Sequence, residues 1–128
     1  MRAAMVLMAV LAGAVHVMFF FVESLWWTTP KVRERFRQTP EQAAHTQVLA
    51  FNQGFYNLFL AIGTFAGLAL GFAGQPHLGL MLVAWNCLTM VAAGIVLASS
   101  APEMRRGAMV QIAPPLLFLV LAAVNAVR

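Results

Sequence analysis

Charged residues are scarce in this chain of 128 residues, of which only 9% are Asp, Glu, Lys or Arg. Soluble domains carry about a quarter of their residues as charged groups, so this composition excludes an ordinary soluble domain. Hydrophobic residues make up 62%, and the mean hydropathy is +0.82. The net charge of +4 comes from residues that flank apolar stretches. We therefore expect a membrane protein with the lipid bilayer as its partner, and no nucleic acid.

Cysteine is nearly absent as well. Cys87 stands alone, which excludes an intrachain disulfide and a cysteine cluster for a metal within one chain. The sequence also lacks a zinc motif, a phosphate-binding loop, a dinucleotide fingerprint and a nucleophile triad. We accordingly predict no metal site, and chemistry that depends on ordinary acid and base side chains.

Long apolar stretches dominate what is present. Each is at least as long as the roughly 20 residues that a spanning helix needs, and none alternates with the period of two of a barrel strand. We predict an all-α, integral membrane four-helix bundle that forms a single transmembrane domain over residues 1–128. The predicted helices cover residues of about 3–25, 41–73, 78–98 and 108–127.

Positive residues are distributed unevenly between the connections. Six lie in the first and third connections: Lys31, Arg33, Arg35, Arg37, Arg105 and Arg106. The opposite side has only Arg2 and Arg128. By the positive-inside rule, the first and third connections face the cytoplasm. This predicts a multi-pass protein of the inner (cytoplasmic) membrane with both termini on the outer (periplasmic) side.

Local signals mark the start and the packing face of the second helix. Thr39 and Gln42 stand at the N-cap and third positions of a capping box, with Pro40 between them. Further along, a glycine at every fourth position, Gly63 to Gly71, predicts close packing against a helix of the same or another chain. Because four thin helices enclose a small core, we also expect a homo-oligomer.

Glu23 ends an otherwise uncharged stretch, and His16 lies seven residues before it. Seven residues are almost two helical turns, so both groups share one stripe of the first helix with Trp27. Ionisable groups inside a span usually face the bundle interior and mark a site, although an interfacial Glu23 is an alternative.

The second helix contains the densest polar cluster, with Asn52 and Tyr56 on one stripe and Gln53 and Asn57 on a parallel one. The predicted topology puts this cluster at the level of Glu23. The later helices add Trp85, Asn86 and Gln111. Such amides can also serve only to join helices, each contributing on the order of 1 kcal/mol.

These groups suit proton transfer in a lipophilic substrate. We predict a membrane isomerase that acts on a small lipophilic molecule by acid/base isomerisation or ring opening, for example of an epoxide to a carbonyl compound. The catalytic residues are then Glu23, His16 and Tyr56, and the substrate-binding residues are Asn52, Gln53, Asn57, Gln111, Trp27, Trp85 and Asn86. The alternatives are a proton-coupled transporter of the small multidrug type and a noncatalytic lipid-binding or assembly subunit.

The motifs resemble a family of small four-helix bacterial membrane proteins known only as a domain of unknown function. The resemblance is carried by His16, Glu23 and Trp27-Thr28-Thr29-Pro30, by Val48-Leu49-Ala50 and the run from Asn52 to Ala61, and by Ala93-Gly94-Ile95, Gln111 and Pro114. It implies the four-helix fold and the same polar positions, without an activity. Pro115 and His45 depart from the family's pattern.

A looser likeness links Ala44-His45 and the following Asn52 to styrene oxide isomerase, a small four-helix membrane enzyme that binds haem through a histidine. This likeness implies haem held by a histidine. The residues themselves offer His16 or His45 as the axial ligand of a haem, although a lone histidine is a weak signal. From the residues alone, no cofactor is required.

Overall fold

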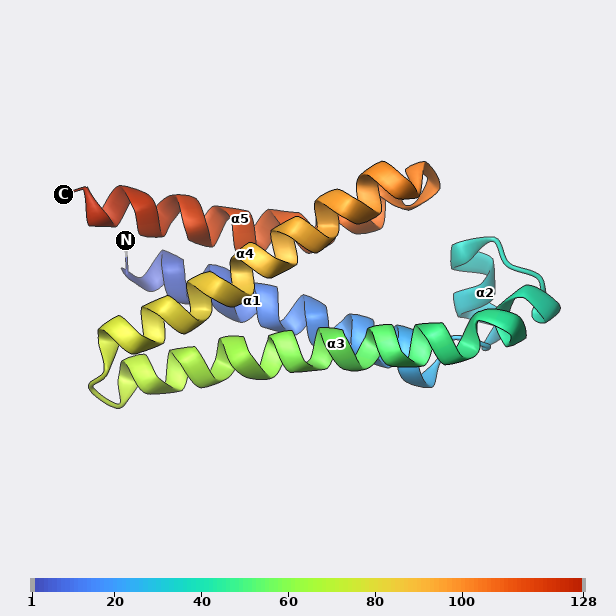
Figure 1. The fold of residues 1–128 in the computed structure, drawn as a ribbon, viewed down its shortest axis with the longest axis horizontal. Coiled ribbons are helices and arrows are strands. Elements are labelled where there is room, and N and C mark those ends of the chain that lie inside the picture. Colours follow the sequence, from blue (N-terminus) through green and yellow to red (C-terminus); the bar gives the residue numbers. More distant parts are fainter. Residues whose placement is uncertain (1, 128) are drawn as a thin grey trace. The chain divides into compact units, whose positions relative to one another are not determined.

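Residues 2–127 are described by a computed structural model, in which they are almost entirely helical and contain no strand. The all-α class predicted from the sequence is therefore confirmed. The α-helices are α1 (Arg2–Phe20), α2 (Pro30–Phe36), α3 (Pro40–Phe72), α4 (Pro76–Ser100) and α5 (Arg105–Ala126) (Figure 1). A π-helical segment, Phe21–Leu25, extends α1, and a 3₁₀ turn, Pro102–Met104, precedes α5.

Within residues 2–127, four helical segments are long and apolar enough to cross a membrane. They are Arg2–Leu25, Pro40–Phe72, Pro76–Ser100 and Pro102–Ala126. The second has 33 residues and is longer than the roughly 20 residues that a bilayer requires. Its first two turns, which contain Glu41 and His45, therefore extend beyond the apolar part of the helix.

The capping box that was predicted at the start of α3 is present. The backbone N–H of Gln42 donates to Oγ1 of Thr39 at 3.2 Å, and the backbone N–H of Thr39 donates to Oε1 of Gln42 at 2.9 Å. Both bonds satisfy N–H groups that the first helical turn leaves without a partner in the helix. The sequence signal therefore located the beginning of the longest helix.

The short helix α2 was not predicted. Pro30 occupies its first turn, where a missing N–H has no consequence, and Arg37 ends it in the left-handed region at φ 54°. Val32 is buried, and the ring of Phe36 lies 5.1 Å from that of Trp27. Seven residues do not give enough periodicity to distinguish such a helix from a turn.

The described residues fall into two compact units. One contains the residues up to Val15 and those from Leu60 onward, and the other is His16–Phe59. The core of the first unit combines side chains of α1, α4 and α5: Ala9, Ala12, Val83, Cys87, Met90 and Phe118. Small alanines on α1 and larger side chains on α4 and α5 let these helices approach closely.

Two glycines of α3 pack against α4 of the same chain. A Cβ atom at Gly63 would lie 2.7 Å from the amide of Asn86, and one at Gly67 would lie 2.7 Å from Val83 and 3.0 Å from the carbonyl oxygen of Gly79. A Cβ at Gly71 would meet nothing within 4 Å. The predicted packing role therefore applies to Gly63 and Gly67, with an intrachain partner, and at Gly71 the backbone alone takes part, since a Cβ at Gly79 would lie 2.6 Å from its nitrogen.

The helix α5 continues through Pro114 and Pro115. Proline has no backbone N–H, so Pro114 cannot donate the helical hydrogen bond to the carbonyl of Val110, and Pro115 cannot donate to that of Gln111. Close contact with α4 supports this stretch, because a Cβ at Gly94 would lie too close to the side chain of Ile112. Irregular backbone bonding is tolerated in a span where neighbouring helices cover it.

Candidate functional site

A carboxylate and a carboxamide meet between the first two long helices. Nδ2 of Asn57 on α3 donates a hydrogen bond of 2.7 Å to Oε2 of Glu23. Asn57 is only 4% exposed, and Glu23 is half-buried. Since both residues belong to candidate membrane spans, this bond gives the carboxylate a polar partner where lipid offers none.

Glu23 lies at the centre of the π-helical segment Phe21–Leu25. The backbone N–H of Trp26 donates to the carbonyl oxygen of Phe21 at 3.0 Å, which is the five-residue spacing of a π turn. Single π turns are rare and occur often at functional sites. The predicted stripe from His16 to Trp27 assumed α-helical spacing throughout, but the α-helix ends at Phe20. The π turn therefore changes the direction in which Glu23 points relative to His16.

The π-helical segment is held against α3 by Ser24 and Gly54. Oγ of Ser24 donates to the carbonyl oxygen of Phe51 at 2.9 Å. A Cβ at Gly54 would overlap Oγ of Ser24 and would lie 3.0 Å from its backbone nitrogen. Gly54 is thus required for the close approach that brings Asn57 to Glu23. Neither residue was predicted to belong to the site, although a glycine inside a polar and aromatic cluster was the available signal.

Aromatic rings pack against each other on the two helices that carry this pair, within the unit His16–Phe59. Phe20 and Phe55 meet edge to face with their centroids 5.1 Å apart, and Phe55 also lies 4.9 Å from Phe51. These rings belong to the same two helices as Glu23 and Asn57. The contact between Phe20 and Phe55 joins the end of α1 to α3.

Trp27, predicted to bind substrate, joins the elements around the first connection. Its Nε1 donates to Oγ1 of Thr46 on α3 at 3.0 Å. Its ring also contacts Phe36 on α2. This position at the end of the π-helical segment fixes where the chain leaves α1, which in turn supports the backbone that carries Glu23.

The remaining predicted residues of α3 are exposed. Nδ2 of Asn52 donates to the carbonyl oxygen of Val48, one turn earlier in the same helix, at 2.8 Å. Gln53 is exposed too, and Tyr56 is 62% exposed. Helical spacing correctly placed these residues near Asn57 along the helix, but it did not reveal which stripe faces α1.

His16 is fully buried, and its ring meets that of Phe19 edge to face at 6.2 Å. It is separated from Glu23 by seven positions, about 10 Å along a helix. His16 therefore belongs to the same helical segment as Glu23, about two turns away from it.

Three predicted residues belong to the unit that contains α4 and α5. Nε2 of Gln111 donates to the carbonyl oxygen of Met90 at 3.3 Å and joins α5 to α4. Nδ2 of Asn86 donates to the carbonyl oxygen of Leu82 in its own helix and packs against Gly63. Trp85 is 68% exposed. Gln111 and Asn86 thus have packing roles within this unit.

The donor set does not favour a metal or haem. Among the described residues, no three His, Cys, Asp or Glu side chains gather closely enough to hold a metal ion. A haem ligand needs an open face beside the imidazole, whereas His16 has no exposed surface. His45 is exposed on the part of α3 that precedes its apolar stretch. We therefore derive no chemistry through haem.

A carboxylate is chemically able to accept or release a proton. Asn57 engages Oε2 of Glu23. This bond fixes one oxygen of the carboxylate. Fixing one oxygen while leaving the other to react is a general way to orient a carboxylate as an acid or base.

Residues 2–127 thus define an all-α protein that has four helices suited to crossing a membrane and a carboxylate–carboxamide pair on two of them. The model of a family described as "Protein of unknown function (DUF1304)" matches residues 10–123, and the chain belongs to this family. The resemblance to a family of unknown function is thereby confirmed. No curated protein and no solved structure matches the chain, and the likeness to styrene oxide isomerase gains no support.

Proposed function

We propose that this protein is a membrane enzyme that isomerises a small lipophilic molecule, with Glu23 as the group that takes and returns a proton. The observation that carries the proposal is the 2.7 Å hydrogen bond from Asn57 to Oε2 of Glu23, within two apolar helices. A carboxylate in a span is costly and is usually retained for function. Asn57 is the positioning residue that orients it.

The reaction class follows from what one carboxylate can do without a redox partner. In double-bond migration beside a carbonyl group, Glu23 removes a proton from one carbon atom, the electron pair shifts along the conjugated system, and the carboxyl group returns the proton to another carbon. In epoxide opening to a carbonyl compound, the carboxylic acid protonates the ring oxygen and one C–O bond breaks, a hydride migrates from the carbon that keeps the oxygen to the cationic carbon, and the carboxylate recovers the proton from the oxygen of the protonated carbonyl. Both reactions conserve all atoms and electrons.

Other groups of this unit have supporting roles in the proposal. Tyr56, Asn52 and Gln53 lie on α3 within five residues of Asn57 and have exposed side chains, so they can bind the oxygen of a substrate that enters from the bilayer. His16 is the second proton-handling group on the helix that carries Glu23. Its contribution is to relay a proton along α1.

The membrane location, the topology and the oligomeric state are part of the same proposal. The four spans form a bundle in the inner membrane, as a homo-oligomer, with both termini outside. The six positive residues of the first and third connections support this orientation. The apolar length of the spans supports direct access of a lipophilic substrate from the membrane.

A proton-coupled transporter is the second candidate, because α1 carries an acidic residue in its spanning segment and this residue is half-buried. Such a carboxylate can bind a proton or a cationic drug in turn. In that case Asn57 still positions Glu23, but Tyr56 and Asn52 are not needed.

The two functions are separated by one set of variants in reconstituted vesicles. The vesicles are incubated with terminal epoxides and with carbonyl compounds that carry an unconjugated double bond, and the products are identified by mass spectrometry. We expect Glu23→Gln to reduce turnover by at least about a hundredfold, the usual effect of losing an acid or base. Glu34→Gln, on the exposed side of α2, is the matched control and retains turnover.

A result in which Glu23→Gln converts substrate as fast as the natural protein would overturn the proposal. If no compound is converted while Glu23 is required for proton-driven export of a cationic dye, the transporter replaces the enzyme. Tyr56→Phe distinguishes the two further, since it slows only the enzyme.

A further inference from the structure

The unit that contains α4 and α5 has a cavity of about 500 Å³. Its walls come from the beginning of α1, the end of α3, the beginning of α4 and the end of α5. The volume falls within the range of roughly 300 to 1,000 Å³ that is usual for pockets that bind small molecules. None of Glu23, Asn57 and His16 lines it, so it is distinct from the proposed proton-transfer site.

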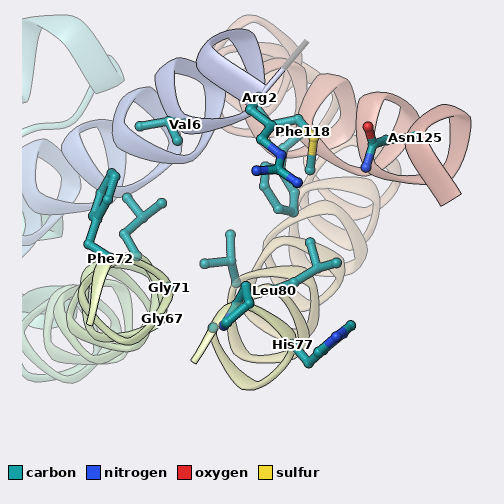
Figure 2. Close-up of a pocket in the computed structure, with 14 residues that line it drawn as sticks. Arg2, Val6, Gly67, Gly71, Phe72, His77, Leu80, Phe118 and Asn125 are labelled. Atoms are coloured by element: carbon teal, nitrogen blue, oxygen red, sulfur yellow. The ribbon is translucent and has the colours of Figure 1, made fainter. Parts of the chain in front are cut away.

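One end of the cavity is polar and the other is apolar. Arg2 and Asn125 belong to the polar end, near the beginning of α1 and the end of α5. Figure 2 shows the side chain of Arg2 extending from α1 toward the middle of the cavity. Phe118 lies seven residues before Asn125, about 10 Å deeper along α5, and forms an apolar wall with Val83. The cavity therefore suits an amphiphile, a molecule with one polar end and one apolar end.

Gly71 is part of the wall on α3 (Figure 2). A Cβ at this position would meet nothing within 4 Å, in contrast to the neighbouring Gly67, which packs against α4. The backbone of Gly71 lies close to Gly79 of α4, because a Cβ at Gly79 would come within 2.6 Å of the Gly71 nitrogen, but the side-chain direction of position 71 is open. Position 71 therefore lines the cavity without filling it.

We propose that this cavity binds a long-chain fatty acid, with its carboxylate at Arg2 and its hydrocarbon chain between α3 and α5. Of the described residues that line the cavity, one is a cation of fixed charge and none is acidic. Arginine pairs well with carboxylates because its guanidinium donates two parallel hydrogen bonds. The cavity is of a size for one small molecule, which favours a single chain over a lipid with two.

Binding is measured with the full chain in nanodiscs of zwitterionic lipid, by native mass spectrometry during a titration with palmitate. One palmitate per chain is expected. Hexadecanol, which has the same chain but no charge, binds more weakly. Arg2→Gln reduces palmitate affinity about threefold, the effect of losing one exposed ion pair, and leaves hexadecanol unaffected.

The matched pair Gly71→Leu and Gly107→Leu tests the location. Neither position has an atom within 4 Å of an added Cβ, but only Gly71 lines the cavity. Gly71→Leu is expected to weaken palmitate and hexadecanol binding alike by about tenfold or more, because it fills the space for the chain. Gly107→Leu has no effect on either.

Three results would overturn the proposal. The first is that palmitate does not bind at one molecule per chain, and the second is that the two leucine variants weaken binding equally. The third is that a two-chain anionic phospholipid binds more tightly than palmitate and that Gly71→Leu weakens its binding. The last result would assign the cavity to a bilayer lipid. None of these binding measurements depends on turnover at Glu23, so this proposal and the proposed function are tested independently.

Discussion

Asn57 donates to the carboxylate of Glu23 across 34 positions of the sequence, at 2.7 Å. The two residues come from different helices, and each is the other's polar partner within candidate membrane spans. Removing either one leaves a polar group that lipid and phenylalanine rings cannot satisfy. The pair therefore has a structural consequence that can be measured without knowing the substrate.

Asn57→Leu is expected to destabilise the protein by about 1 to 3 kcal/mol, because it leaves the half-buried carboxylate of Glu23 without its amide donor. Stability is measured by denaturant titration in detergent. The control is Asn52→Leu, since Asn52 is exposed and bonds only within its own helix. Equal losses for both variants would mean that the bond to Glu23 contributes nothing to stability.

Gly54→Ala is expected to lower the thermal stability through a clash with Ser24, with a loss of about 1 to 3 kcal/mol. Combining it with Ser24→Ala restores part of the loss, because Oγ of Ser24 is the atom nearest to the added methyl group. Gly107→Ala, at an open position, leaves the melting temperature unchanged or raises it. A double variant no more stable than Gly54→Ala alone would contradict this explanation.

Gly67→Ala and Gly71→Ala are expected to differ although both glycines lie on one stripe of α3. An added methyl group at Gly67 meets Val83 and Gly79, whereas at Gly71 it meets nothing within 4 Å. Gly71→Ala should even add stability, up to about 1 kcal/mol, through helix propensity. Parallel thermal unfolding of the two variants tests the difference, and a similar loss for both would show that α3 packs in another register.

Thr39→Ala is expected to destabilise the first turn of α3 by about 1 kcal/mol, since it removes one bond of the capping box. The measurement is hydrogen exchange, in which the backbone amides of Gln42 and its neighbours are expected to exchange faster. Thr28→Ala, in the exposed turn before α2, is the control. Unchanged exchange in Thr39→Ala would indicate that α3 begins later in solution.

Much of the fold could be predicted because its signals are local. Twenty uncharged apolar residues can only span a membrane or form a core, and the spacing from Thr39 to Gln42 specifies a helix start. The positions of Gly63 and Gly67 indicated a close helix contact. That this contact is made with α4 depends on tertiary packing, which a single sequence does not contain.

The site was predicted only in part. Helical spacing brought Glu23 and Asn57 to one level, and the structure joins them. The same spacing also predicted Asn52 and Tyr56 as site residues, because periodicity tells which residues share a helix face and not which face meets another helix. The π turn around Glu23 could not be predicted, since no residue pattern in Phe21–Leu25 distinguishes it from an α-helix.

The central claim is that Glu23 takes a proton from a bound lipophilic molecule and returns a proton to it, with exchange against water while the proton is on the carboxyl group. It is tested most directly by deuterium incorporation: vesicles that contain the protein are placed in D₂O with an unconjugated unsaturated ketone, and deuterium in the recovered ketone is measured by mass spectrometry. The account predicts incorporation with the natural protein and with Glu34→Gln, and none above background with Glu23→Gln. Incorporation by Glu23→Gln at the rate of the natural protein would contradict it.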